Sequence, residues 1–187
     1  ELKSIKIGKK VKTINMHAFY YCRNVETLTL GNQIENIELY AFYELESLTS
    51  LTIPDSVKKI NDYAFYECDY LTSLTLSKNL IEIGSNAFSG CSRIQGSLKI
   101  PDSVMYIYSN AFSGCRNFMS LTLGSSLISI GSSAFSECYG FSGALKIPDS
   151  VEDIEENAFE GCSNFESLTL SSKLDTIKSW VFEKCNK

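Results

Sequence analysis

Apolar and polar residues alternate over three positions at regular intervals along the chain, with one polar residue between two aliphatic ones. The aliphatic pairs are Ile5/Ile7, Leu28/Leu30, Leu51/Ile53, Leu74/Leu76, Leu98/Ile100, Leu121/Leu123, Leu145/Ile147 and Leu168/Leu170. This alternation places both aliphatic side chains on one face of a strand and the residue between them on the other. The pattern predicts one short strand for each pair, with one buried side and one solvent-facing side.

An Ala-Phe pair follows each alternation. Its phenylalanines are Phe19, Phe42, Phe65, Phe88, Phe112, Phe135, Phe159 and Phe182, spaced 23 or 24 residues apart. A period of this length over the whole chain is typical of a solenoid, in which each turn buries its apolar face only against its neighbours. We therefore predict a single solenoid domain over residues 1–187, with eight turns whose strands stack into a parallel sheet.

Cysteine stands three residues after seven of these phenylalanines, and Leu45 takes the same place after Phe42. In a helix, Ala18, Phe19 and Cys22 would share one face because residues three and four apart are neighbours. The spacing predicts one helical turn in each repeat. Together with the strands, it predicts an α/β fold class.

Alternate repeats resemble each other most closely. The string Ile-Pro-Asp-Ser-Val occurs at 53–57, 100–104 and 147–151. Its proline directly follows the strand, where the missing N–H and the fixed φ end a ladder. The two 24-residue repeats each have one extra residue, beside Gly96 and Gly143. These features indicate that the array grew by duplication of a pair of repeats.

The full pattern, clearest from Leu48 to Cys68, resembles the BspA-like leucine-rich repeats, and its Ala-Phe-x-x-Cys element makes the resemblance specific. The resemblance covers every turn, with Leu45 in place of one Cys and Val181 in place of one Ala as small departures. It implies a right-handed, curved solenoid with a parallel sheet on the concave side. It also implies a surface-exposed or secreted microbial protein that binds host proteins, matrix proteins or other cells, and it brings no fixed set of ligand-contacting residues.

Composition and charge narrow the possible functions. The chain is 44% hydrophobic and 21% charged, as in a folded protein, and has a formal net charge of −5. This charge argues against a nucleic-acid-binding protein, which needs a basic face. We find neither a transmembrane helix nor a signal peptide in the sequence. Both ends fall at the same phase of the repeat, so we expect the chain to be part of a longer array.

The residues offer little catalytic or metal-binding equipment. The cysteines recur at the repeat period rather than at zinc-ligand spacing, and Leu45 replaces one of them, so we predict a buried column of unpaired thiols. His17 is the only histidine and stands before Ala18, where other repeats carry Tyr, Asn, Ser or Trp; we interpret it as a repeat-face residue. An acidic cluster in the seventh repeat lacks the spacing of a calcium loop. We therefore expect no enzyme activity, metal or cofactor.

The solvent-facing positions of the predicted strands are uniform. The position between the paired aliphatic residues reads Lys6, Thr29, Thr52, Thr75, Lys99, Thr122, Lys146 and Thr169. This column lacks the Trp, Tyr and Arg side chains that anchor most protein interfaces. We interpret the concave sheet as scaffold rather than as a recognition surface.

Tyrosine is concentrated near the N-terminus of the array. The candidate ligand-binding residues are Tyr20, Tyr40, Tyr43, Tyr63 and Tyr66, where later repeats carry Asn, Ser and Glu. One interpretation is that the rings stack between neighbouring turns and stabilise the fold. The others are a contact surface for a protein partner, since tyrosine is enriched at interfaces, and a contact between copies of the array.

These observations favour a non-catalytic module for protein–protein interaction or adhesion, with a protein partner and no nucleic acid or membrane insertion within this segment. The resemblance places it on the cell surface or outside the cell. The alternative is a repeat scaffold for intracellular or secreted interactions with no adhesive role.

Overall fold

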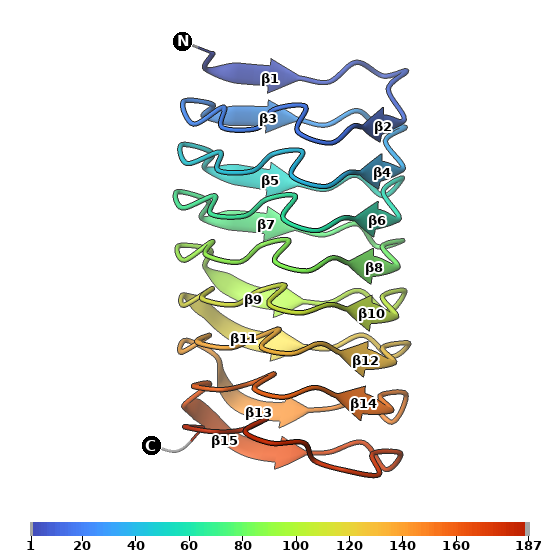
Figure 1. Ribbon diagram of the computed structural model, residues 1–187, viewed down its shortest axis with the longest axis vertical. Coiled ribbons are helices and arrows are strands. Elements are labelled where there is room, and N and C mark those ends of the chain that lie inside the picture. The colour runs from blue at the N-terminus through green and yellow to red at the C-terminus, as the bar shows by residue number, and fades with distance from the viewer. Residues whose placement is uncertain (1, 186–187) are drawn as a thin grey trace.

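The strands predicted from the aliphatic alternation form in the computed structural model, which describes residues 2–185. They are stacked along the long axis of the molecule and make up what we call the first face (Figure 1). These strands are β1 (Ser4–Lys6), β3 (Thr27–Thr29), β5 (Ser50–Thr52), β7 (Ser73–Thr75), β9 (Gly96–Lys99), β11 (Phe118–Thr122), β13 (Ser142–Lys146) and β15 (Asn164–Thr169). The fold is a parallel β-solenoid, as the repeat period predicted.

A second, two-residue strand follows on another face of the solenoid. These strands are β2 (Thr13–Ile14), β4 (Asn36–Ile37), β6 (Lys59–Ile60), β8 (Glu82–Ile83), β10 (Tyr106–Ile107), β12 (Ser129–Ile130) and β14 (Asp153–Ile154). They form one continuous seven-stranded parallel sheet, with Ile37 in register with Ile60. Each strand directs an isoleucine into the core, which fixes the register because a slip by one residue would expose it.

Seven turns are complete, with a strand on both faces, whereas the sequence predicted eight. The eighth repeat contributes β15 on the first face and no second strand within the described residues. Ile177, which occupies the place of the short-strand isoleucine, is 57% exposed, whereas Ile14 in the first repeat is 4% exposed. A two-residue strand needs both a ladder partner and a buried side chain, and here the burial is missing.

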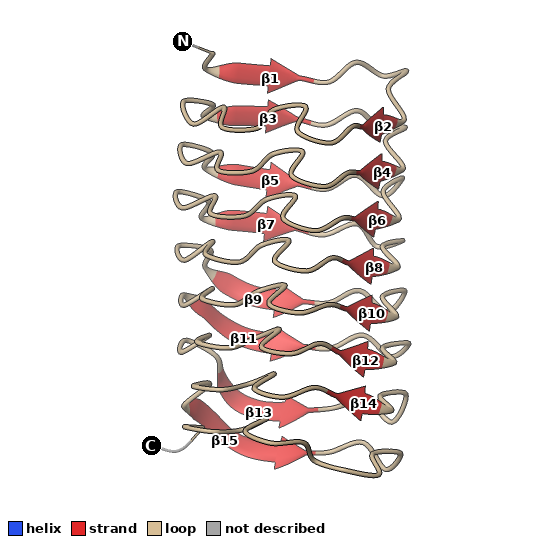
Figure 2. Ribbon diagram, in the orientation of Figure 1, coloured by secondary structure: helices blue, strands red, loops and turns tan. Residues whose placement is uncertain are grey.

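The predicted helical turns are wrong, and with them the α/β class: the described chain contains strands and turns but no helix (Figure 2). It therefore also has no helix long and apolar enough to cross a membrane. Two residues of each Ala-Phe segment have left-handed φ, for example 55° at Tyr40 and 52° at Glu44. The N–H groups of Tyr40, Phe42 and Glu44 donate to carbonyls of the next turn. A helix needs those same groups for its own i→i−4 bonds, so it cannot form.

The phenylalanines of the Ala-Phe pairs form the central column of the core. Neighbouring rings stack almost in parallel, with centroids 5.3 Å apart for Phe88 and Phe112 and 5.6 Å apart for Phe112 and Phe135. Phe42 to Phe159 are fully buried, while Phe19 and Phe182 in the outermost repeats are partly exposed. Each fully buried ring is therefore flanked by the rings of the two adjacent turns.

The first face is not the continuous sheet that the sequence predicted. Its strands pair as β1–β3, β5–β7, β9–β11 and β13–β15, which leaves an open seam after every second strand. The N–H of Ile53 donates to the Thr75 carbonyl at 2.9 Å within a pair, but the equivalent N–H of Leu76 reaches no acceptor across the β7/β9 seam. Leu74 and Leu76 are consequently only half-buried, whereas Leu51 and Ile53 are fully buried.

The Phe column predicts a large cost for losing one ring. Phe112→Ala should lower the free energy of unfolding by about 3–5 kcal/mol, the usual range for a buried Phe. The control is Met119→Ala, because Met119 is 62% exposed and its loss should change the free energy by at most about 0.5 kcal/mol. Denaturant unfolding followed by circular dichroism measures both. A loss of less than about 1 kcal/mol for Phe112→Ala would show that the column does not hold the turns together.

Candidate functional site

The five candidate tyrosines lie on the return turns, the segments that carry the Ala-Phe pairs. Each return turn runs back from a short strand to the next first-face strand, across the side of the stack opposite the first face (Figure 1). The alternating hydrogen bonds between return turns hold corresponding residues of successive repeats in register. Side chains at the same position of the repeat therefore form columns along the solenoid.

The first aromatic column contains His17, Tyr40 and Tyr63, each two residues before the repeat Phe. All three have left-handed φ, at 58°, 55° and 55°. The rings of His17 and Tyr40 stack at 5.1 Å between centroids, and those of Tyr40 and Tyr63 at 4.8 Å. Left-handed φ is unfavourable for bulky residues, so the stacking and the inter-turn hydrogen bonds must offset the strain.

The second column contains Tyr20, Tyr43 and Tyr66, each directly after the repeat Phe. Ring centroids are 5.0 Å apart both for Tyr20 and Tyr43 and for Tyr43 and Tyr66. Edge-on contacts join the two columns, such as Tyr40 with Tyr43 at 5.4 Å. The structure thus brings all five candidate tyrosines into one cluster, and their stacking between turns agrees with the structural interpretation.

Two further aromatic residues complete this cluster. His17 heads the first column, and Tyr21 packs on Tyr20 at 4.2 Å and on Tyr43 at 5.5 Å. We call the group the aromatic surface: His17, Tyr20, Tyr21, Tyr40, Tyr43, Tyr63 and Tyr66. The sequence reasoning left out His17 and Tyr21. His17 could have been included because it shares its repeat position with Tyr40 and Tyr63. Tyr21 could have been included because it directly follows Tyr20.

The aromatic surface is open to solvent at its N-terminal end and more covered further along. Tyr20 is 38% exposed and Tyr21 is 45% exposed, while Tyr40, Tyr43, Tyr63 and Tyr66 are half-buried. Burial, with a smaller contribution from Glu67, raises the pKa of Tyr66 to about 12. Tyr66 therefore presents apolar ring area and a neutral hydroxyl group at physiological pH.

An ionic rim borders one side of the aromatic surface. Arg23 pairs with the carboxylates of Glu44 and Glu46, the latter at 3.2 Å, and its guanidinium lies 4.7 Å from the centre of the Tyr21 ring. Glu44 is buried. The pKa of Tyr43 is raised by the burial of its own side chain and, to a smaller extent, by the negative charge of Glu44. An apolar centre with a charged edge is the usual arrangement of a protein interface.

The ring of His17 contacts those of Tyr20 and Tyr40, with centroids 5.0 and 5.1 Å apart. No group of three or more His, Cys, Asp or Glu side chains in residues 2–185 has the arrangement of a metal site.

The cysteines form a buried ladder beside the Phe column. All seven are free thiols; Cys68 to Cys162 are buried, as predicted, whereas Cys22 and Cys185 are half-buried. The thiols of Cys91, Cys115, Cys138 and Cys162 each donate to a Phe carbonyl at 3.2 Å. Burial raises the pKa of all four thiols. Because the thiolate is the reactive form, these cysteines are structural and not nucleophilic.

Comparison with known proteins agrees with this architecture. The family described as "BspA type Leucine rich repeat region (6 copies)" matches residues 1–115 and 94–187. No curated protein matches the sequence.

Several solved structures share the fold. A leucine rich cell surface protein from Faecalibacterium prausnitzii is 25% identical with a TM-score of 0.60, and the match covers 99% of this chain and 58% of that one. The pneumococcal vaccine antigen PcpA is 24% identical with a TM-score of 0.69, over 98% of this chain and 48% of that one. The leucine rich repeat protein of T. pallidum is 22% identical with a TM-score of 0.76, over 86% and 77%. The chain thus spans 58% of the F. prausnitzii protein and 48% of PcpA.

The thiol ladder predicts a loss of stability at alkaline pH. Because folding holds these four thiols neutral, the unfolded chain releases their protons first, and stability falls as pH rises above the unfolded pKa of about 8.5. Over this range each buried thiol should lower the free energy of unfolding by up to about 1.4 kcal/mol per pH unit. Denaturant unfolding between about pH 8.5 and 10 measures the slope, which Cys115→Ala should reduce by one thiol's share. A flat profile, or rapid modification of all seven cysteines in the native protein, would contradict the buried ladder.

Proposed function

Because the chain belongs to the BspA-type leucine-rich repeat family, we propose that it is an adhesion module of a surface-exposed microbial protein. In this proposal it binds a protein of a host, of the extracellular matrix or of another cell, and the aromatic surface makes the contact. The family is a repeat family rather than a catalytic one, which supports binding as the activity.

The observation that carries the proposal is the concentration of aromatic residues on one solvent-accessible part of the return turns. Tyrosine offers a large apolar area and a hydroxyl while losing little conformational entropy, and it is enriched at interface centres. Here the rings are already fixed by their neighbours in both columns, so little further ordering opposes binding. The columns end at Asn86 and Ser89 in the fourth repeat, which gives the surface a defined boundary.

The proposed location at the cell surface rests on the family and on the F. prausnitzii protein, which is described as a cell surface protein. An interaction scaffold without an adhesive role is the alternative. Immobilised plasma proteins and matrix deposited by cultured cells are suitable test surfaces for the purified chain. Absence of binding to all of them would favour the alternative.

The double substitution Tyr43→Ser/Tyr66→Ser tests the contact surface. Later repeats carry Ser89 and Ser113 at this position, so the fold should accept the change. We expect binding to the test surface to weaken at least tenfold, which corresponds to about 1.4 kcal/mol. Binding should be measured by surface plasmon resonance, well below the melting temperature of both proteins.

The matched control is Tyr70→Ser/Tyr139→Ser, which removes two exposed tyrosines that stand outside the aromatic surface. Its affinity should equal that of the unmodified chain. If Tyr43→Ser/Tyr66→Ser lowers the melting temperature but leaves the affinity unchanged, the aromatic surface stabilises the fold and does not contact the partner.

A further inference from the structure

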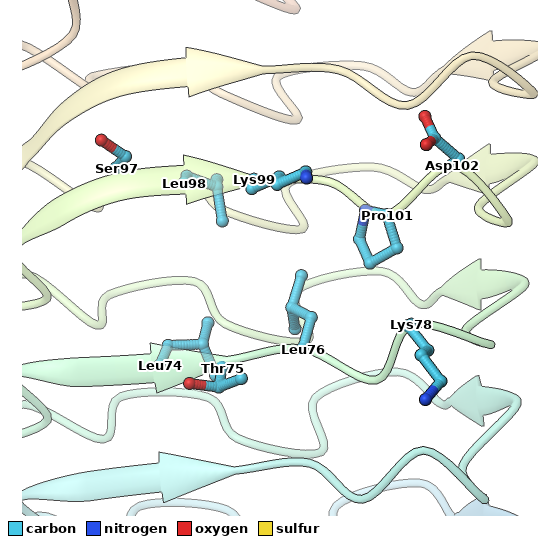
Figure 3. A pocket seen from close by; sticks show the side chains of 9 residues that line it. All are labelled: Leu74, Thr75, Leu76, Lys78, Ser97, Leu98, Lys99, Pro101 and Asp102. Carbon is cyan, nitrogen blue, oxygen red and sulfur yellow. The ribbon is translucent and has the colours of Figure 1, made fainter.

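The sheet of short strands offers a continuous outer surface, whereas the first face is divided by its seams. Figure 3 shows the β7/β9 seam, where the ring of Pro101 and the side chain of Leu76 point toward each other from adjacent turns. The seven short strands, in contrast, pair in one unbroken parallel sheet. Hydrogen bonds also link the residues that precede these strands, since the N–H of Met105 donates to the Ile81 carbonyl. A partner can therefore dock across several turns of this sheet.

Three of the short strands follow identical residues but carry different side chains on their outer surface. The string Ile-Pro-Asp-Ser-Val leads into Lys-Lys at 58–59, Met-Tyr at 105–106 and Glu-Asp at 152–153. The residue after the inward-pointing isoleucine then reads Asn61, Tyr108 and Glu155. All of these positions are exposed or half-buried. The outer surface thus changes from basic at β6 through apolar at β10 to acidic at β14.

The apolar part of this surface extends over three turns. Tyr106 and Tyr108 stack with ring centroids 6.3 Å apart, and Tyr108 is 42% exposed. Ile81 and Ile128 occupy the place of Met105 in the turns on either side, and Ile81 is 38% exposed. We call these five residues the sheet patch. An exposed apolar cluster with charged residues at its ends is typical of a protein interface.

The charged ends of the sheet patch are only partly neutralised within the chain. At the basic end Lys59 pairs with Glu82 at 2.9 Å, while Lys58 is exposed and forms no ion pair within the described residues. At the acidic end three carboxylates share two lysines. Their ion pairs join Lys178 to Asp153 and Glu155 at 2.7 and 2.8 Å, and Lys173 to Glu152 at 3.3 Å. Exposed ion pairs contribute little, so each end can accept groups of opposite charge.

A hollow of about 320 Å³ lies beside Tyr108, on the side of the following turns. It is lined in part by Ser129, Gly131, Asp153 and Glu155. Burial raises the pKa of Tyr108, and the charges that act most on its hydroxyl are those of Glu82 and Lys59 in the preceding turns. The hydroxyl therefore lies on the β8 side of β10, and the hollow lies on the β12 side.

From this pattern we propose that two copies of the chain dimerise through their sheet patches. A two-fold axis parallel to β10 places the two sheets face to face, with the solenoids running in opposite directions. In this arrangement β10 lies over β10 of the other copy, β8 over β12, and β6 over β14. Every contact of a two-fold interface occurs twice with the roles exchanged, so the surface must be complementary to itself.

The sheet patch and its charged ends meet this requirement about β10. The residues that face each other in the two copies are Ile81 with Ile128, Lys58 with Glu152, and Lys59 with Asp153. Tyr108 projects toward β8, so its ring reaches the other copy over β12, where the hollow lies. A parallel arrangement would instead place Lys58 against Lys58 and Glu152 against Glu152. The reversal of charge along the sheet therefore selects a second, antiparallel copy as the partner.

Sedimentation equilibrium of the purified chain should show a dimer, with a dissociation constant that rises as salt is raised. Met105→Lys/Tyr106→Lys gives the central turn the residues that Lys58 and Lys59 provide in the third turn, so the fold should accept it. We expect the dissociation constant to rise at least tenfold. The control Met119→Lys/Tyr139→Lys replaces an exposed methionine and an exposed tyrosine outside the sheet patch and should leave dimerisation unchanged.

Charge exchange tests the antiparallel arrangement. Lys58→Glu/Lys59→Glu makes both ends acidic, and Glu152→Lys/Asp153→Lys makes both ends basic. Each variant should stay monomeric by itself, whereas an equimolar mixture should form a heterodimer about as tightly as the unmodified chain dimerises. The control Lys9→Glu/Lys10→Glu changes the net charge as much as the first variant, at exposed lysines outside the sheet, and should dimerise normally. Circular dichroism shows whether each variant is folded.

Several outcomes would overturn the proposal. A monomer at every concentration would do so, as would normal dimerisation of Met105→Lys/Tyr106→Lys or failure of the two folded charge variants to associate. If the chain stays monomeric and Met105→Lys/Tyr106→Lys instead loses binding to the plasma or matrix proteins, the sheet patch contacts another protein. Tyr43→Ser/Tyr66→Ser should dimerise normally, so this proposal and the adhesion proposal can fail separately.

Discussion

Every turn of this solenoid gives backbone N–H groups to the turn that follows, and the rest of the structure depends on that constraint. Buried peptide groups must be paired, and a repeat that contains neither a helix nor a hairpin pairs many of them with its neighbours. On the return turns, Tyr40, Phe42 and Glu44 donate to the next repeat while the residues between them close local turns. This alternation requires left-handed residues at two positions, and it holds identical positions in register. The Phe stack, the thiol ladder and the aromatic surface are all consequences of that register.

Much of the fold could be predicted from the sequence because the period is visible without any structure. The strand pairs, the buried Phe column and the buried cysteines follow from residue type and spacing alone. The return turn could not be predicted in the same way, because a spacing of three and four residues is shared by a helix and by a succession of tight turns. The distinguishing signal was present, however: Asn86, Asn110 and Asn157 share one position and Gly90, Gly114 and Gly161 another, and both residue types tolerate left-handed φ.

The candidate site was predictable in part for a related reason. Tyr20 to Tyr66 could be grouped because the same repeat positions carry them in consecutive turns, and the structure adds His17 and Tyr21 through ring contacts that sequence spacing does not report. The seams of the first face were not predictable. They depend on the proline ring of one turn meeting Leu76 of another, a steric relation between residues 25 positions apart.

The tight approach of two turns at Gly124 also restricts how such an array can change its length, because a Cβ atom on Gly124 would lie 2.1 Å from the Pro101 carbonyl oxygen. A proline turn must be followed by a turn whose first residue is small, as Ser77, Gly124 and Ser171 are after Pro54, Pro101 and Pro148. Recombination that adds or removes a 47-residue pair preserves this order, since Pro54, Pro101 and Pro148 are 47 residues apart. The first two repeats carry small residues in succession, Gly8 and Gly31, so two small-residue turns can stand side by side. From the third repeat on, loss of a single small-residue repeat would set two proline turns side by side, with no small residue next to the carbonyl of the first. In that part of the array the unit that can be gained or lost is therefore the pair of repeats, although the unit of winding is the single one.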